Sequence, residues 1–325
     1  MIRRDGEGSL KTRAVTEGAM SAVIIVLLSC FNFTFGFVGP LIPIPLAMVV
    51  YRHGLKAGMA VSFVSAAVTS LILASPIIGL DLMIIGILGI AIGLAVKEGF
   101  SFTYIFIVGV GASVIASVLR LFTFSLIAGY SLIEEFAVLW EGVSQQVLEF
   151  WQAADMPTEI MAQYTELITN MPTLFQMLLP VSVLIYGIFE TVICLLGLGI
   201  VFRRFGVSLP RIPRFIHWKL PWYFVWGFIA CKAMAIILAY FPSHIVQVIV
   251  LNLDLFFSGA FFIQGLAIMW FFMTQAEISK VVRVLITAVA LVTGNVLVYY
   301  ILTMLGVMDT WFDIRKLNNA GKGGY

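Results

Sequence analysis

The stretch at residues 172–202, PTLFQMLLPVSVLIYGIFETVICLLGLGIVF, contains a single charged side chain, Glu190. A helix of this length, at about 1.5 Å per residue, exceeds the roughly 30 Å hydrocarbon core of a bilayer and is predicted to be a transmembrane span. Residues 134–166 hold seven acidic residues and no Lys or Arg, whereas residues 203–219 hold five basic residues and no acid. Because short cytoplasmic loops are enriched in Lys and Arg, we expect the basic flank inside and the acidic flank outside.

The composition extends this interpretation to the whole chain. Of its 325 residues, 61% are hydrophobic and 11% are charged, against about 45–50% and about 25% in soluble domains. The formal net charge of +2 gives no reason to expect a nucleic acid partner. Three cysteines, Cys30, Cys194 and Cys231, lie far apart in apolar runs, a pattern unlike a disulfide framework or a zinc site. The expected surrounding is therefore the lipid bilayer, with no metal ion or cofactor.

The apolar runs predict an all-α polytopic bundle of eight or nine spans, with an amphipathic helical insertion outside the membrane. The runs cover about 15–35, 41–51, 57–74, 82–96, 102–130, 172–202, 222–240, 245–272 and 281–305. The second run is short and rich in proline, so we expect it to be bent or partly unwound. Nine continuous spans place Arg315 outside, whereas a break at Ser258-Gly259 keeps the tail inside, and the sequence leaves both possibilities open.

The charge pattern also suggests a domain organisation. A basic N-terminus at 1–14 is expected in the cytoplasm, and a six-span module follows at 15–203. A basic cytoplasmic loop at 204–220 leads to a C-terminal module of two or three spans at 221–306 and a tail at 307–325. Within the first module, apolar residues in the acidic segment 131–171 recur at three- and four-residue spacing, which predicts two amphipathic helices. A lid over the bundle and a spacer resting on lipid headgroups both fit this pattern.

Four ionisable residues lie well inside the apolar runs: Arg120, Glu190, Lys232 and Asp254. Charges are costly in lipid and are expected to pair or to line a polar path. Helix rise places Glu190 and Lys232 at similar depth with Arg120 within reach, so we predict that these three form one network. The network either fixes the register of the helices or binds a ligand. Asp254 is expected near the outer surface, in contact with solvent.

Enzyme signatures are absent from the sequence, which has no H-E-x-x-H, no G-x-S-x-G and no Walker lysine loop. We therefore predict a protein that is not an enzyme. Active transport by such a chain would need an ion gradient or a separate ATPase. Gly89 and Gly93 form a small-xxx-small pair that is expected to let two helices approach closely.

Two stretches carry a family resemblance: FSGAFFIQGLA at 257–267 and LGVMDTWFDIRKL at 305–317. On these the chain resembles the YybS-like family of bacterial membrane proteins, which has no settled activity. The first six spans are similar to the substrate-binding S components of energy-coupling-factor transporters, on PLIPIP at 40–45 and GLKAG at 54–58. Rod-shape scaffold proteins of the MreD type are similar over the same helices. The S-component resemblance implies a ligand near Asn32 and Arg120, and a first helix that faces a membrane coupling subunit with its ATPases through Ala14, Gly18 and Ala22.

These features predict a transport-related, multi-pass protein of the bacterial cytoplasmic membrane. It would bind a small solute in an outward-facing pocket through Arg120, Glu190, Lys232 and Asn32. The alternative is a scaffold or regulatory protein that recruits cytoplasmic or cell-envelope partners through the 311–316 segment and the basic loop. The basic residues of that loop are Arg203, Arg204, Arg211, Arg214 and Lys219.

Overall fold

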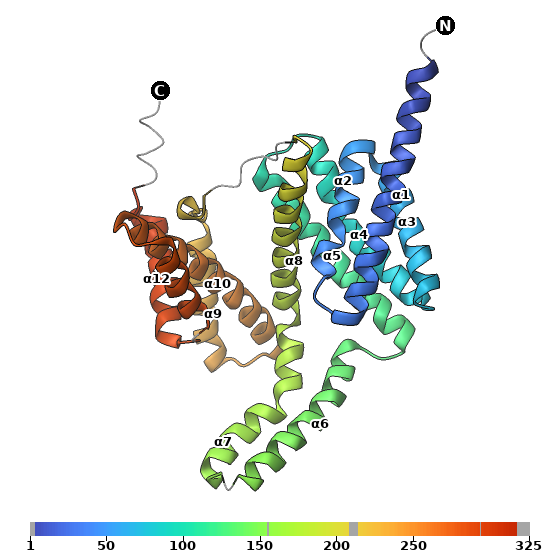
Figure 1. Cartoon of the computed structure of the whole chain (residues 1–325). Helices are drawn as coiled ribbons and strands as arrows, with labels where there is room; N and C mark the ends of the chain where they lie inside the picture. The colour runs from blue at the N-terminus through green and yellow to red at the C-terminus, as the bar shows by residue number, and fades with distance from the viewer. Residues whose placement is uncertain (1–3, 155, 208–213, 293, 317–325) are drawn as a thin grey trace. The chain divides into compact units, whose positions relative to one another are not determined.

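The computed structural model describes residues 4–154, 156–207, 214–292 and 294–316, and within these ranges every regular element is a helix. The helices form two compact units, each of which is described separately (Figure 1). Unit 1 takes in the described residues of 1–176 and 182–211. Unit 2 takes in those of 177–181 and 212–325.

Unit 1 is built around the short helix α2. Its helices are α1 (Arg4–Phe35), the 3-10 turn η1 (Gly39–Leu41), α2 (Pro43–His53), α3 (Leu55–Ile72), α4 (Pro76–Lys97), α5 (Phe102–Ala128), α6 (Leu132–Ala153), α7 (Thr158–Thr169) and α8 (Met171–Arg204). Helices α1, α3 and α4 all pack on α2, whose residues from Pro43 to Val50 are almost all buried. The expectation of a bent or unwound second span is wrong. Pro43 and Pro45 fall in the first turn, where a helix needs no N–H donor, so α2 continues without a break.

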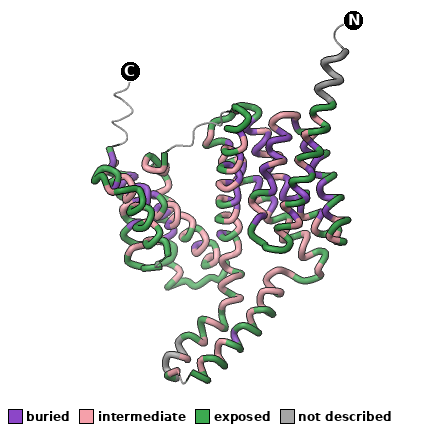
Figure 2. Tube along the Cα trace, in the orientation of Figure 1, coloured by how far each residue is buried: buried purple, intermediate pink, exposed green. Residues whose placement is uncertain are grey.

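Glycines of α4 set the spacing of this core. A Cβ added at Gly89 would lie 2.7 Å from the carbonyl oxygen of Pro43, and one added at Gly93 would lie 2.6 Å from the carbonyl oxygen of Ala47. Side chains at these two positions would therefore force α4 away from α2. Figure 2 shows buried residues gathered in this part of unit 1, whereas α6 and α7 are mostly exposed or half-buried.

The acidic segment forms the two helices that its periodicity predicted. The N-terminus of α6 carries a capping box, in which Ser131 and Glu134 each accept a hydrogen bond from the other's backbone N–H. Trp140 Nε1 donates to the carbonyl oxygen of Ile168 at 2.7 Å, which ties α6 to α7. Figure 1 shows this pair, which we call the hairpin, projecting from the ends of α5 and α8. It does not fold back over unit 1 as a lid, because the first turns of α8 extend in the same direction and pack on it through Phe175 and Phe136.

Unit 2 contains η2 (Phe215–His217), α9 (Phe224–Tyr240), α10 (His244–Gln275), α11 (Lys280–Val292) and α12 (Val296–Phe312). The suggested break at Ser258-Gly259 is wrong, because α10 runs through both residues. The break falls instead inside the run predicted as one span at 281–305. There Gly294 adopts a left-handed conformation and the side chain of Asn295 caps α12, so α11 and α12 meet at an angle of 113°.

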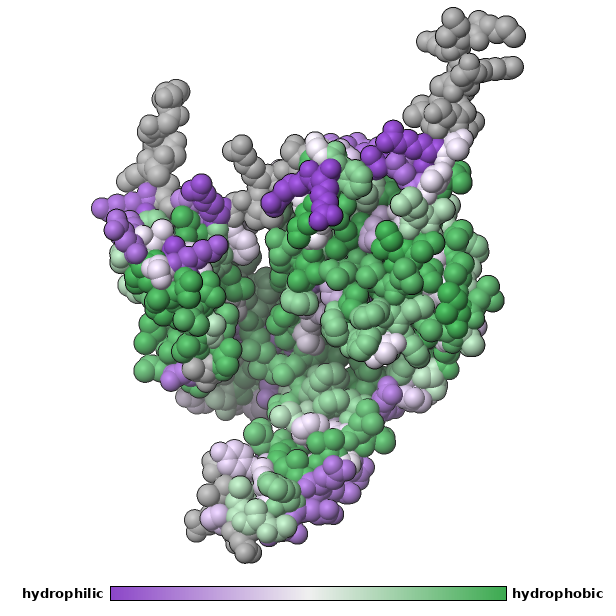
Figure 3. All heavy atoms as spheres, in the orientation of Figure 1, coloured by the Kyte–Doolittle hydropathy of each residue, from purple (hydrophilic) through white to green (hydrophobic). Residues whose placement is uncertain are grey.

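Six described helices are long and apolar enough to cross a membrane: α1 from Thr12, α3, α4, α5, α8 and α10. The bent pair α11 and α12 makes a seventh candidate if it counts as one span, and α9 is apolar but has 17 residues. Within each unit, Figure 3 shows hydrophobic surface over these helices and hydrophilic residues toward their ends. The chain is thus a polytopic helical membrane protein.

Candidate functional site

A pair of charged residues joins α4 to α5 in unit 1. Arg120 Nε lies 2.5 Å from Asp81 Oδ1, and Arg120 Nη2 lies 3.3 Å from Asp81 Oδ2. Asp81 belongs to the second turn of α4 and Arg120 to the last third of α5, so antiparallel packing brings the two together. Both side chains keep 35% of their surface exposed. The pair is therefore reachable from one end of the bundle.

Glu190 on α8 is only 3% exposed and lies within electrostatic range of this pair. Its carboxylate accepts a hydrogen bond from the Ser113 hydroxyl on α5. The Tyr186 side chain, one turn earlier on α8, lies close to both Glu190 and Arg120. We call Asp81, Arg120, Tyr186, Glu190 and Ser113 the Glu190 network.

The network spans a range of depths. Counted from the ends of α5 and α8 that carry Phe102 and Arg203, Ser113 and Glu190 lie about 17–20 Å along their helices. Arg120 lies about 27 Å along α5 on the same count. The polar side chains thus lead from a partly exposed ion pair near one end of the bundle to a buried carboxyl near its middle.

Lys232, which the sequence predicted to lie with Glu190, forms an ion pair inside unit 2. In unit 2 its Nζ lies 2.8 Å from Asp254 Oδ1, which pairs α9 with α10, and it also lies 5.3 Å from the centre of the Phe228 ring. Asp254 is therefore an ion-pair partner and not a freely solvated residue. Helix rise gives the depth of a side chain but not the direction in which it points, so equal depth did not identify the partner.

A second buried cluster lies where α10, α12 and the 214–220 segment meet in unit 2. The ion pair of Arg315 and Asp309, at 2.8 Å, has no exposed side-chain surface. Arg315 also donates to the carbonyl oxygens of Ile216 and Trp218, each at 2.7 Å. Gln264 Nε2 donates to Asp309 Oδ2 at 3.1 Å. These contacts fix the end of α12 against the segment before α9.

The same cluster shows why α10 and α12 lie so close together. Gln264 Oε1 accepts from the backbone N–H of Leu220, while its Nε2 also reaches the carbonyl oxygen of Gly306 and the Thr310 hydroxyl. A Cβ on Gly306 would collide with the backbone of Phe261, and one on Gly265 with the backbone of Leu302. We call Gln264, Asp309, Thr310 and Arg315 the Asp309 cluster. Sequence reasoning missed it, although Gln264 inside an apolar run was a signal.

A further polar contact on α1 was also missed. Glu17 accepts hydrogen bonds from Arg13 at 3.0 Å and from Arg52 at 2.8 Å, and its Oε2 lies 2.8 Å from His53 Nε2. This group ties the start of the first span to the end of α2. The basic turn at Arg52 and His53 is therefore anchored to α1.

The other predicted site residues occupy structural positions. Asn32 Oδ1 accepts from the backbone N–H of Gly39 at 2.6 Å and fixes the turn before η1. Gly18 and Ala22 are buried and Ala14 is half-buried. Gly18 faces Val61 of α3, and Ala22 packs in the core with α2 and α3. They let α1 approach its own neighbours.

The basic loop residues also differ among themselves. Arg203 and Arg204 are exposed at the end of α8, and Arg214 is exposed before η2. Lys219 forms an ion pair with Asp313 at 2.9 Å. Arg211 lies outside the described residues. In the 311–316 segment, buried Arg315 is not available to a partner, whereas Trp311 and Phe312 are exposed.

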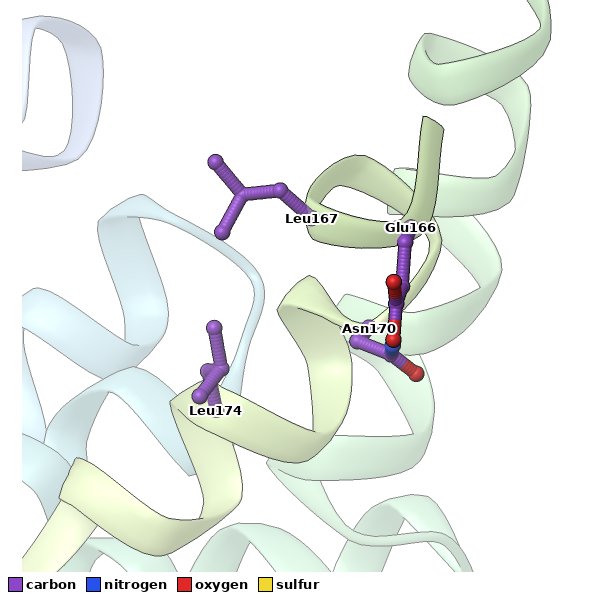
Figure 4. Close-up of a pocket in the computed structure, with 4 residues that line it drawn as sticks. All are labelled: Glu166, Leu167, Asn170 and Leu174. Carbon is purple, nitrogen blue, oxygen red and sulfur yellow. The ribbon is translucent and has the colours of Figure 1, made fainter. Parts of the chain in front are cut away.

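A shallow pocket lies at the base of the hairpin. It is lined by Glu166, Leu167, Asn170 and Leu174. Figure 4 shows the two leucines on one side and Glu166 with Asn170 on the other. None of Arg120, Glu190, Lys232 or Asn32 lines it.

Comparison with known proteins gives a family but no activity. A family model described as "Predicted membrane protein (DUF2232)" matches residues 20–310. The chain is 21% identical over 324 residues to the "Uncharacterized protein YybS" of Bacillus subtilis (strain 168), covering 94% of this chain and 98% of that protein. No solved structure matches the chain.

Proposed function

Since the chain belongs to the DUF2232 family of predicted membrane proteins and places charged side chains between its spans, we propose that it is a transport-related protein that binds a small polar solute at the Glu190 network. The observation that carries the proposal is the polar route from the half-exposed Asp81–Arg120 pair to buried Glu190. Ionisable groups inside a membrane bundle are costly, and they commonly mark pathways for solutes or protons. The proposed site does not include Lys232, which pairs with Asp254, or Asn32, which bonds to the backbone of Gly39.

The proposed topology has eight spans and a re-entrant pair. Six segments of unit 1 cross the membrane, namely α1, α2, α3, α4, α5 and α8, and α9 and α10 add two from unit 2. Arg315 and Asp313 contact the 216–219 segment, so the end of α12 lies on the same side as the basic loop. Helices α11 and α12 then enter and leave from that side. Positive-inside bias makes this side cytoplasmic, in a bacterial cytoplasmic membrane, and puts the hairpin outside.

The solute would meet the network from the hairpin side. Asp81 and Arg120 lie near the ends of α4 and α5 that face the hairpin, and they offer a carboxylate and a guanidinium to a polar ligand. Glu190 and Tyr186 lie deeper and supply a carboxyl group and a hydroxyl group, respectively. Such a set suits a solute that carries both donors and acceptors.

Purification from native membranes in a mild detergent, followed by mass spectrometry of bound small molecules and proteins, tests the proposal. The wild type should retain a polar small molecule that Glu190→Gln and Arg120→Gln lose while eluting as monodisperse protein. Asp254→Asn serves as the matched control, because it removes a carboxylate from unit 2. Equal retention by all four proteins would refute solute binding at the network.

The alternative role as a scaffold or regulatory protein is favoured by one observation: Arg203, Arg204 and Arg214 stay exposed beside the membrane. Such basic residues bind acidic partners and also anionic headgroups, at about 1 kcal/mol per charge. Co-purification of cell-envelope or signalling proteins, lost on neutralising these three residues, would support this role. Co-purification of a coupling subunit with ATPases would support a transport component.

A further inference from the structure

The hairpin uses one apolar face to hold itself together. The rings of Phe136 and Phe175 stack with centroids 4.3 Å apart, and Trp151 packs edge-on against Tyr164 at 6.0 Å. Together with the Trp140 hydrogen bond to Ile168, these contacts join α6 to α7 and to the start of α8. Phe136, Trp140 and Trp151 thus form the side of α6 that faces α7 and the start of α8.

Directly beside these inward residues, an apolar stripe on α6 remains exposed. Leu139, Val143 and Phe150 lie four and seven residues apart and so share one face of the helix. Their exposed fractions are 65%, 45% and 69%. Exposed apolar residues that gather on one helical face mark an interaction surface, whereas single ones need no explanation.

The charge beside this stripe defines what can cover it. Residues 131–171 contain no Lys or Arg, and none of the ion pairs found among the described residues involves a hairpin carboxylate. The described carboxylates are those of Glu134, Glu135, Glu141, Glu149 and Glu166. Figure 3 shows hydrophilic surface on the hairpin directly beside apolar surface. An anionic membrane repels such a surface, and helices that lie on membranes usually carry Lys and Arg on their polar face.

The pocket at the base of the hairpin fits the same partner chemistry. Its Leu167 and Leu174 wall can hold an aliphatic stem, and its Glu166 and Asn170 wall can hold a cationic head (Figure 4). Lys and Arg side chains have this divided character. Leu167 is itself 48% exposed, so the pocket is open to a side chain from outside.

From the apolar stripe, the unpaired carboxylates and the pocket together, we propose that the hairpin is a docking surface for a basic, amphipathic segment of a partner protein. The apolar side of that segment covers Leu139, Val143 and Phe150, and one of its Lys or Arg side chains enters the pocket at the base of the hairpin, beside Glu166. This surface is separate from the Glu190 network, so the inference does not depend on solute binding there.

A binding experiment on the full chain in phosphatidylcholine nanodiscs tests the proposal. The probe is a fluorescent amphipathic peptide with leucines on one face and lysines on the other. A version with glutamates in place of the lysines and empty nanodiscs are the controls. At physiological salt, the protein should bind the lysine peptide only. The double variant Leu139→Ser/Phe150→Ser should weaken binding about tenfold or more, because it removes two large apolar contacts.

The charge dependence is tested with a matched pair of variants. Glu166→Gln should weaken binding about threefold or more, since a charge-assisted hydrogen bond is lost. Glu141→Gln removes the same charge from the side of α6 opposite the apolar stripe, because Glu141 is two residues from both Leu139 and Val143. This variant should change the affinity less than about twofold. Equal effects of the two variants, or no effect of the apolar double variant, would show diffuse charge attraction and overturn the proposal.

A second measurement asks whether the bilayer already covers the stripe. A bimane label is placed at Leu139→Cys or Gln145→Cys in a chain without its native cysteines, reconstituted in vesicles that contain brominated phosphatidylcholine. The proposal requires little quenching at both positions. Strong quenching at position 139 alone would show that lipid, and not a protein partner, occupies this face.

Discussion

Replacement of Arg315 by Met should destabilise unit 2 strongly. The change leaves the Asp309 carboxylate buried without its cation, and it removes the donors to the carbonyl oxygens of Ile216 and Trp218. Removal of one partner of a buried ion pair costs about 3–5 kcal/mol. Asp309 keeps hydrogen bonds from Gln264 and from the backbone N–H of residue 315, so we expect the lower half of that range, about 3–4 kcal/mol.

The double variant Asp309→Asn/Arg315→Met separates the charge effect from the lost contacts. With both charges gone, the remaining cost is that of hydrogen bonds to two carbonyl groups, about 1–3 kcal/mol. Lys316→Met is the matched control, since it removes an exposed neighbouring cation and should be near neutral. Unfolding by SDS titration in dodecyl maltoside, followed by tryptophan fluorescence, measures all four proteins. Arg315→Met within about 1 kcal/mol of wild type, or a double variant at least as costly as Arg315→Met alone, would refute the buried-pair argument.

Three further predictions follow from local geometry. Gly93→Leu should abolish the monodisperse peak in size-exclusion chromatography, because its side chain meets the α2 backbone, whereas Gly111→Leu, with open space around it, should not. Hydrogen bonds from Ser131, chiefly from its backbone N–H, lower the pKa of Glu134 below its ordinary 4.5. The ionised carboxylate therefore stabilises the first turn of α6 above pH 4.5, and this stability is lost as the pH falls through the lowered pKa. Hydrogen exchange at the start of α6, corrected for its intrinsic pH dependence, should show that loss in the wild type and no pH dependence in Glu134→Gln. The proposed topology puts the end of α12 in the cytoplasm, so a green fluorescent protein fused after residue 317 should fluoresce and alkaline phosphatase fused there should be inactive. An active phosphatase and a dark fluorescent protein would contradict the re-entrant pair.

Hydrophobic patterning predicted the helices well because each depends on its own stretch of sequence. The run at 172–202 lies inside α8, and the periodicity at 131–171 gave the hairpin. In unit 2 the errors arose at glycines. Gly259 stays helical, whereas Gly294 next to the capping residue Asn295 ends one helix before the next begins. The sequence analysis did not consider Gly294-Asn295 as a helix boundary, because the apolar run continues on both sides of it.

The partners of the buried charges were not readable in this way. Depth along a helix follows from residue number, but the direction of a side chain depends on how the helices pack. Arg120 therefore pairs with Asp81, and Lys232 pairs with Asp254. The sequence thus identified the charged side chains inside the apolar runs, but not the residues with which Arg120 and Lys232 pair.

The Asp309 cluster bears on what the family resemblance means. The two stretches that carry the resemblance, 257–267 and 305–317, are the ones that meet in this cluster, through Gln264, Asp309 and Arg315. The hydrogen bonds of Gln264 and Arg315 end on other groups of the chain, at Leu220, Gly306, Ile216 and Trp218. Side chains used in this way hold helices together, and each loses its partners if one is replaced. The resemblance in these stretches is therefore evidence for the fold of unit 2, and a search for activity is better directed at the Glu190 network and the hairpin.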